Sequence, residues 1–355
     1  MSIPGLVGKI QTVLGPIPAE DLGITLTHEH LLWDFSCYFV EPAAASEKGI
    51  AYQPVSLENL GWILYNSIKN LDNIRLWDKE IAVSEAFQYK QAGGSAIVDM
   101  TNIGIGRDPQ GLQYVARSTG LHVIMGSGYY LGISHPSELG RKTEEEITEE
   151  MVRDITIGVN DTGVRAGIIG EIGCSYPLMT DGERKVLRAA ARAQQRTGAP
   201  IAVHPGYPNE NSLFEIIEVL GEAGGDLNRT VLCHMDYFEF ADGTEQISNL
   251  AEAGCYIEYD NFGRLGRITG RGKLVDLPSE GQRLDTIKQV IDQGHLNKIL
   301  ISQDLCLKMR LTRHGGTGYG YILHHLIPLM RAKGFSEKNI HTLLVENPKR
   351  LLQFV

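Results

Sequence analysis

Five short apolar runs along this chain each close with side chains that can bind a metal ion. A run of about four to eight β-branched and apolar residues between turn signals is typical of a strand buried on both faces, as in parallel sheets. Parallel strands end at the same edge, so their terminal side chains are expected at one rim. The runs are ITLTHEH with His28 and His30, AGIIGEIG with Glu171, PIAVHP with His204, TVLCHMD with His234, and KILISQD with Asp304.

Strand candidates alternate with helical patterns, which is the order expected of a parallel β/α architecture. Eight such units in 355 residues favour a single domain, residues 1–355, folded as a closed (β/α)8 TIM barrel of the α/β class. An open doubly wound sheet is disfavoured because HEHLLWD stands where its glycine-rich phosphate loop would follow the first strand. The predicted strands are 24–30, 95–101, 122–127, 166–172, 200–204, 230–235, 255–259 and 298–303.

The sequence predicts where several helices begin and end. The S/T-x-x-E spacing of a capping box occurs at Thr143 with Glu146, at Thr180 with Glu183 and at Ser212 with Glu215, and predicts three helix starts. Gly120 and Gly198 stand where the preceding helices should stop.

Composition limits the partners. A net charge of -10 disfavours nonspecific binding to nucleic acid or to anionic membranes. The start of the chain lacks a signal-peptide pattern, and no stretch reaches about 18 apolar residues. Five cysteines without a CxxC pair indicate reduced thiols and a cytoplasmic protein. We therefore expect a small-molecule substrate, no nucleic-acid or membrane partner, and a homodimer as the default assembly.

The six candidate ligands together predict a binuclear metal centre at the C-terminal face of the strands, with two divalent ions per chain. His28 and His30 alternate along one strand, so both are expected to face one ion while Glu29 faces away. Glu171 can bridge two ions about 4 Å apart. Two such ions can bind a hydroxide between them and polarise a carbonyl or phosphoryl oxygen of the substrate. Asp304 is expected to be a ligand and the catalytic proton acceptor. Ligands without thiolate suit zinc, our first expectation, or manganese, iron or cobalt.

These segments resemble a known group of enzymes. The order HxH, bridging ligand, His, His and Asp is similar to the amidohydrolase superfamily. TLTHEHL, GEIG, HPG, CHMD and ENPKRLL, together with GIIGEIGCS at 167–175 and ERKVL at 183–187, resemble its phosphotriesterase family over essentially the whole chain, and in particular the phosphotriesterase-related branch. The resemblance implies that His28, His30 and Asp304 surround a buried ion, that His204 and His234 surround an exposed one, and that residue 171 is shared.

The chain also differs from that family at two positions. Glu171 stands where family members usually carry a carboxylated lysine. Asn261, in EYDNFG, stands where bacterial phosphotriesterases use a histidine in a proton relay, and an amide cannot take a proton. Animal members of the branch are associated with hydrolysis of small N-acylated compounds. The resemblance therefore implies a carbon-centred substrate, namely an amide, ester or lactone.

Loops after the strands supply the candidate substrate-binding residues, because those loops face the site in a barrel. Arg310 and Arg313 follow the eighth strand and are predicted to hold an anionic group, since a guanidinium recognises such oxygens bidentately. Tyr129 and Tyr130 follow the third strand and are candidates to line the pocket or to donate to a developing oxyanion. Asp260 follows the seventh strand and is a candidate to orient the substrate or a basic loop residue.

We predict a metal-dependent hydrolase that uses a metal-bridging hydroxide to cleave a small carboxylic amide, ester or lactone bearing an anionic group. Hydrolysis of phosphotriesters or phosphoesters at the same centre is the alternative, because both reactions would use the same ligands. A non-catalytic binding protein is a third interpretation. A structural zinc site would be closed by four ligands, often thiolates, and a serine nucleophile would need a G-x-S-x-G elbow that the chain lacks.

Overall fold

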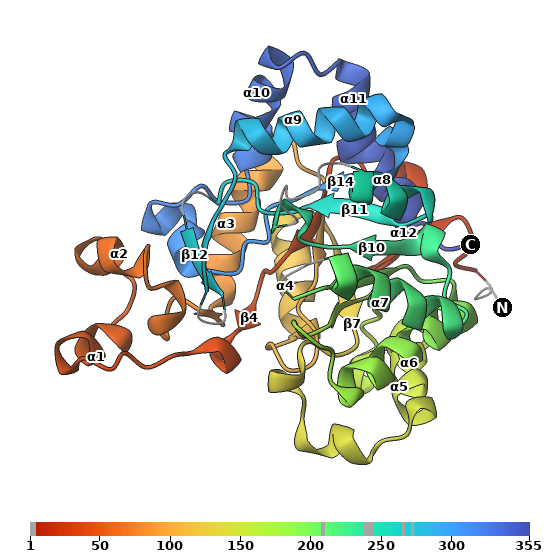
Figure 1. The fold of residues 1–355 in the computed structure, drawn as a ribbon, viewed down its shortest axis with the longest axis horizontal. Helices are drawn as coiled ribbons and strands as arrows, with labels where there is room; N and C mark the ends of the chain where they lie inside the picture. Colours follow the sequence, from red (N-terminus) through yellow and green to blue (C-terminus); the bar gives the residue numbers. More distant parts are fainter. Residues whose placement is uncertain (1–4, 207–209, 238–244, 265–266, 271–272) are drawn as a thin grey trace.

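The computed structural model describes residues 5–206, 210–237, 245–264, 267–270 and 273–355. At its centre is a sheet of eight parallel strands whose order follows the chain (Figure 1). The sheet curls into a nearly closed barrel, in which the amide of Asp304 donates to the carbonyl oxygen of His28 at 3.0 Å. All eight predicted strands are confirmed. They are β3 (Thr25–Glu29), β6 (Ala96–Asp99), β7 (His122–Ser127), β8 (Ile168–Gly173), β9 (Ile201–His204), β10 (Thr230–Leu232), β11 (Tyr256–Tyr259) and β14 (Ile299–Ile301).

Helices run between the strands and cover the outside of the barrel (Figure 1). Two further pairs of short strands and two small helices extend the loops at the end where the barrel strands terminate. The helices are α1 (Ala45–Ala51), α2 (Leu57–Ile63), α3 (Lys79–Gln91), α4 (Pro109–Thr119), α5 (Glu144–Thr156), α6 (Asp181–Thr197), α7 (Glu210–Glu222), α8 (Glu245–Glu252), α9 (Glu280–Val290), α10 (Ile327–Ala332), α11 (Glu337–His341) and α12 (Asn347–Leu352). The short strands are β4 (Trp33–Asp34) with β5 (Arg75–Leu76), and β12 (Arg267–Gly270) with β13 (Lys273–Asp276).

The observed helix ends can be compared with the predicted caps. Thr143 and Thr180 each accept the third backbone N–H of α5 and α6, so both boxes are confirmed. The box predicted at Ser212 is wrong, because α7 begins at Glu210 and Ser212 already lies in its first turn, where serine is tolerated. Gly120 and Gly198 end α4 and α6 in the left-handed conformation, with φ of 68° and 74°, as predicted.

Two apolar clusters divide the core into a lumen and an outer layer. Val98, Ile124 and Leu300 belong to the cluster that fills the barrel. Their strand neighbours Ile97 and Val123 belong to the larger cluster that includes the helices. This alternation is what a barrel strand requires, because successive side chains point to opposite faces.

The first and last described segments of the chain contact each other. A hairpin of β1 (Lys9–Thr12) and β2 (Gly15–Pro18) precedes the first barrel strand. The amide of Gly8 donates to the carbonyl oxygen of Phe354, and the amide of Phe354 donates to Lys9, both at 2.9 Å. None of the described helices combines the length and the apolar character needed to cross a bilayer. All five cysteines are free thiols.

Candidate metal centre

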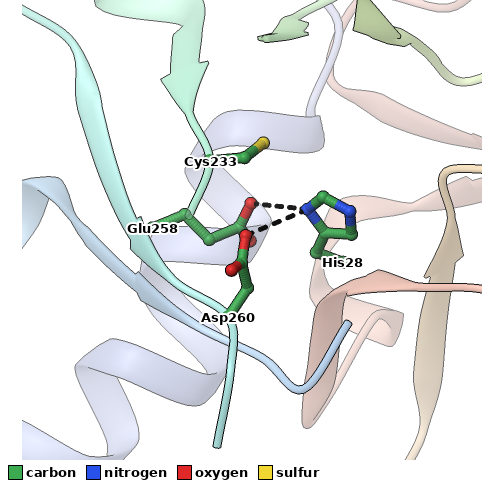
Figure 2. A group of neighbouring side chains, drawn as sticks. All are labelled: His28, Cys233, Glu258 and Asp260. Carbon is green, nitrogen blue, oxygen red and sulfur yellow. Dashed lines mark hydrogen bonds and ion pairs between the residues drawn. The ribbon is translucent and has the colours of Figure 1, made fainter. Parts of the chain in front are cut away.

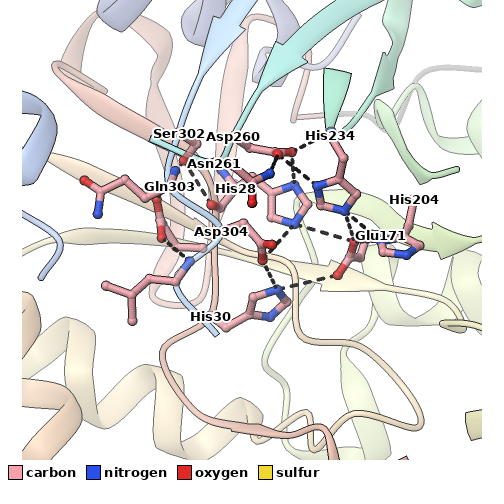
Figure 3. Close-up of polar contacts among 12 residues, drawn as sticks. His28, His30, Glu171, His204, His234, Asp260, Asn261, Ser302, Gln303 and Asp304 are labelled. Atoms are coloured by element: carbon pink, nitrogen blue, oxygen red, sulfur yellow. Dashed lines mark hydrogen bonds and ion pairs between the residues drawn. The ribbon is translucent and has the colours of Figure 1, made fainter. Parts of the chain in front are cut away.

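The six predicted ligand residues meet at the C-terminal rim of the barrel (Figure 3). Glu171 lies at the middle of the group, with its side chain 2% exposed. Its Oε1 lies 3.5 Å from Nε2 of His30. Its Oε2 lies 3.5 Å from Nε2 of His28, 2.9 Å from Nδ1 of His204 and 3.5 Å from Nε2 of His234. One carboxylate therefore faces four imidazoles, which is the position of a shared ligand.

Asp304 approaches the group from the opposite side. Its Oδ1 lies 3.4 Å from Nε2 of His30 and 3.9 Å from Nε2 of His28. His28, His30 and Asp304 thus form one compact set of ligand atoms, and His28, Glu171 and His234 form a second set. The two sets share His28 and lie side by side.

Local irregularities in two strands turn the ligands into the barrel. Between Leu26 and Glu29, β3 has one residue more than β6, and between Ile169 and Ile172, β8 has one residue more than β9. Leu26 and Ile169 belong to the outer layer. Each extra residue changes which side chains face inward, as in a β-bulge. His28 and Glu171 reach the lumen rim for this reason.

Two of the candidate ligands have a left-handed backbone, which is uncommon for residues other than glycine. The φ angle is 61° at His234 and 45° at Asp304. Such conformations cost on the order of 1–3 kcal/mol and persist only where surrounding contacts impose them. At His234 the contact is the carboxylate of Asp260, whose Oδ2 accepts the backbone N–H of His234 at 2.9 Å.

The Nε2 atoms of His28 and His30 are buried and lack a hydrogen-bond partner among the described residues. Nδ1 of His28 lies 3.2 Å from Oδ2 of Asp260, which leaves Nε2 as the ring nitrogen that can bind a metal. Nε2 faces the oxygens of Glu171 and Asp304. Buried polar atoms are normally paired, and a ring nitrogen among carboxylate oxygens is satisfied by a bound proton or by a cation. The donor set therefore fits a divalent metal bound by imidazole and carboxylate.

Asp260 is fully buried behind the imidazoles of two candidate ligands, and its expected role in orienting the substrate or a basic loop residue stays a prediction. Its Oδ1 accepts from Nδ1 of His234 at 2.8 Å, and its Oδ2 faces Nδ1 of His28. Figure 2 shows Asp260 and Glu258 converging on His28, with Cys233 beside them. Asp260 thereby sets the tautomer and ring orientation of two candidate ligands from two different strands.

Burial and neighbouring charges set the ionisation of the carboxylates. Burial disfavours their charged forms, but His28 and His204 hold the pKa of Glu171 well below its ordinary range. In the same way, His234 and His28 outweigh burial and keep the pKa of Asp260 low. Burial lowers the pKa of His204. Although burial opposes it, Cys233, Glu171 and Asp260 raise the pKa of His28 well above its ordinary value, and Asp260 raises the pKa of His234 to about 10. Without a metal the site therefore pairs ionised carboxylates with protonated imidazoles, and a bound cation would displace those protons.

The two predicted tyrosines point in different directions. The hydroxyl of Tyr129 donates to Glu150 at 2.5 Å, toward α5 and away from the ligands. The hydroxyl of Tyr130 lies 3.3 Å from Nε2 of His204 and accepts a hydrogen bond from Tyr38 at 3.0 Å. Only Tyr130 of this pair lines the centre, and Tyr38 joins it from the segment after the first barrel strand.

The two predicted arginines lie in different surroundings. Arg310 is buried, and its guanidinium donates to the backbone oxygens of Asp304 at 2.7 Å and Phe262 at 2.9 Å. These donors hold the loops around the centre, and the substrate-binding role expected for Arg310 stays a prediction. Arg313 is exposed, and its backbone N–H donates to Glu85 at 3.0 Å.

Arg264 is a cation at the centre that the sequence analysis did not single out. Its Nη1 lies 3.9 Å from Oδ2 of Asp304 and donates to Oδ1 of Asn261 at 3.2 Å. Arg264 follows β11, so the rule that loops after barrel strands face the site could have identified it.

The whole chain is similar to known hydrolases. The model of the phosphotriesterase family matches residues 8–352. The N-acetyltaurine hydrolase of Bos taurus is 40% identical over 350 residues, which cover 98% of this chain and 99% of that protein. This agrees with the resemblance inferred from the HxH and GEIG segments.

Two solved structures share the fold. A resiniferatoxin-binding protein from Rhodobacter sphaeroides superposes with a TM-score of 0.92 at 38% identity, covering 98% of this chain and 95% of that one. The phosphotriesterase homology protein from Escherichia coli, complexed with phosphate in its active site, gives a TM-score of 0.76 at 29% identity, covering 94% and 99%.

Proposed function

The chain belongs to the phosphotriesterase family of metal-dependent hydrolases, and on that premise we propose that it cleaves a small carboxylic amide bearing an anionic group. Relatives 39–40% identical over 350 residues are N-acetyltaurine hydrolases, whose name describes an amide attached to a sulfonate. The observation from this chain that carries the proposal is Arg264, whose guanidinium lies beside Asp304 at the candidate metal centre. Esters and lactones are the neighbouring substrate classes.

We further propose that the six residues hold two divalent ions, with zinc as the first candidate. His28, His30 and Asp304 would hold one ion, His204 and His234 the other, and Glu171 would be shared. When bound, such ions supply a Lewis acid for the scissile carbonyl and lower the pKa of the attacking water.

The side chains around the ligands would divide the remaining work. Asp304 would accept the proton, and the contacts of its Oδ1 with the imidazoles and of its Oδ2 with Arg264 support this role. A planar guanidinium at that point can bind a sulfonate or carboxylate bidentately. Tyr130, with Tyr38 bonded to its hydroxyl, would form the wall beside His204 and limit the access of water.

A phosphoester or phosphotriester would meet the same ligands and remains the second candidate, since the Escherichia coli relative holds phosphate in its active site. The relatives named as amide hydrolases are more similar to this chain and favour carbon centres. At the level of the whole molecule we propose one functional domain over residues 1–355, a cytoplasmic location consistent with five free thiols, and a homodimer.

The test is hydrolysis of a panel by metal-reconstituted protein and by Arg264→Ala. The panel contains N-acetyltaurine, N-acetyl amino acids, an uncharged N-acetyl alkylamine, lactones, aryl esters and phosphotriesters. A hydrogen bond to a charged group contributes about 1.5–3 kcal/mol, so Arg264→Ala should raise KM for the anionic amides by about 10-fold or more. KM for the uncharged amide should change little. Arg313→Ala is the matched control, because Arg313 is an exposed arginine on another loop of the same rim.

Two results would contradict the proposal. Equal effects of Arg264→Ala on charged and uncharged amides would remove the role of the guanidinium in binding the anion. Faster turnover of phosphotriesters than of any amide would favour the second candidate.

A further inference from the structure

Glu29 is a fully buried carboxylate between two candidate ligands, and its side chain points away from both of their imidazoles. Its Oε1 accepts the backbone N–H of Gln303 at 2.8 Å and the hydroxyl of Ser302 at 2.8 Å. Its Oε2 accepts the backbone N–H of Leu305 at 2.9 Å. One carboxylate on β3 therefore accepts three hydrogen bonds from the segment that follows β14.

Asp304, which has a left-handed φ of 45°, lies between Gln303 and Leu305, the two residues whose backbone N–H groups donate to Glu29. Its own N–H donates to the carbonyl oxygen of His28 at 3.0 Å, and its own carbonyl oxygen accepts from Nη1 of Arg310 at 2.7 Å. Four backbone groups between the amide of Gln303 and the amide of Leu305 are thus held, three by Glu29 and His28 of the first barrel strand and one by Arg310 of the same loop. An L-residue avoids this conformation unless its surroundings impose it.

We propose that Glu29 is the positioning residue for Asp304: by accepting the amides on both sides of it, Glu29 imposes the left-handed backbone and aims the Asp304 carboxylate at His28 and His30. This role would explain why a carboxylate occupies the middle of the His-Glu-His triplet. A carboxylate has two oxygens and no donors, so both of its ends can accept amides that diverge around a turn. The inference rests on the proposed metal centre, because it concerns the aim of one of its ligands.

The test compares Co²⁺-loaded wild-type protein with Co²⁺-loaded Glu29→Gln. Glutamine has the same shape, but one end becomes an NH2 group that cannot accept from either amide. The visible bands of Co²⁺ report ligand geometry directly, and competition with a chromophoric chelator gives the affinity. We expect altered bands and an affinity lower by about 10–100-fold, the usual effect of disturbing a group that orients a metal ligand. For N-acetyltaurine, kcat should fall much more than KM changes.

Glu85→Gln is the matched control. Glu85 is likewise buried, lies on α3, and accepts the backbone N–H groups of Thr312 at 2.9 Å and Arg313 at 3.0 Å in the same loop, well beyond Asp304. Its loss should lower the melting temperature and leave the Co²⁺ bands unchanged. A general loosening of the loop would instead change the bands equally in both variants and would overturn the proposal.

Arg310→Lys covers the case in which Glu29→Gln does not fold. Lysine cannot reach the oxygens of Asp304 and Phe262 together, so this variant loosens the same peptide from its other side. It should shift the bands in the same way, and unchanged bands would refute the positioning role. Failure of the wild-type protein to bind Co²⁺ would remove the metal centre itself, whereas normal binding by wild type and Glu29→Gln alike would remove only the role of Glu29.

Discussion

Asp260→Asn is expected to weaken metal binding without touching any ligand atom. The carboxylate accepts from Nδ1 of His234 at 2.8 Å, from the backbone N–H of His234 at 2.9 Å and from the side-chain Nδ2 of Asn261 at 2.8 Å, and it faces Nδ1 of His28 at 3.2 Å. Four donors therefore converge on two oxygens, two on each. Asparagine keeps one oxygen and places an NH2 group against the other two donors.

The magnitude follows from that geometry. If the amide oxygen stays beside Nδ1 of His234, the backbone N–H of His234 and the ring of His28 each lose an acceptor. Each unsatisfied buried donor costs about 1–3 kcal/mol, so unfolding should become easier by about 2–6 kcal/mol. In the opposite orientation Nδ1 of His234 loses its acceptor. Either way one ring is released, and affinity for the metal should fall by about 10–100-fold, equivalent to about 1.4–2.8 kcal/mol.

Chelator competition measures the affinity, and urea denaturation of the metal-free protein measures the stability. Glu183→Gln is the control, because Glu183 is equally buried and accepts from Gly132, Ser175 and Thr180 without contacting an imidazole. It should lose stability and keep its metal affinity. The reasoning fails if Asp260→Asn loses as much stability as Glu183→Gln while binding the metal as tightly as wild type.

Three further outcomes are expected. Arg283→Met should destabilise the fold by about 3–5 kcal/mol in urea denaturation, because it leaves Asp236, 2.9 Å away, and Glu280, 3.2 Å away, as buried charges without their cation. Tyr129→Phe should lower the free energy of unfolding by about 1 kcal/mol and leave kcat and KM unchanged, since the Tyr129 hydroxyl donates to Glu150. A change in KM would indicate that Tyr129 contacts the substrate. Removal of metal by dialysis against a chelator should abolish hydrolysis, and added Zn²⁺ should restore it; activity that survives dialysis would argue against metal dependence.

The barrel could be predicted because its causes are local and repeat along the chain. Runs of β-branched residues such as those before His204 and Asp304 can be buried only as strands covered on both faces, and their alternation with amphipathic helices admits few topologies. Capping boxes at Thr143 and Thr180 act over four residues, so the sequence specifies those helix starts directly. The same logic failed at Ser212, where spacing alone cannot distinguish a cap from a residue in the first turn.

The candidate ligands could also be predicted from the sequence, because a parallel barrel gathers the ends of its strands at one rim whatever the loops do. The residues that orient and surround them could not. Arg310 and Arg264 are two arginines on neighbouring rim loops, and only the packed structure turns one guanidinium toward backbone oxygens and places the other beside Asp304.

The architecture, the rim and the identity of the candidate ligands follow from the sequence alone, because they depend on periodicity and on the order of the strands. The direction in which each ligand points depends on tertiary contacts. Extra residues in β3 and β8 change which side chains face inward, and the left-handed backbones at His234 and Asp304 are imposed by carboxylates on other strands. The physical reason is that such conformations are unfavourable locally, so they exist only when hydrogen bonds from distant residues outweigh their cost.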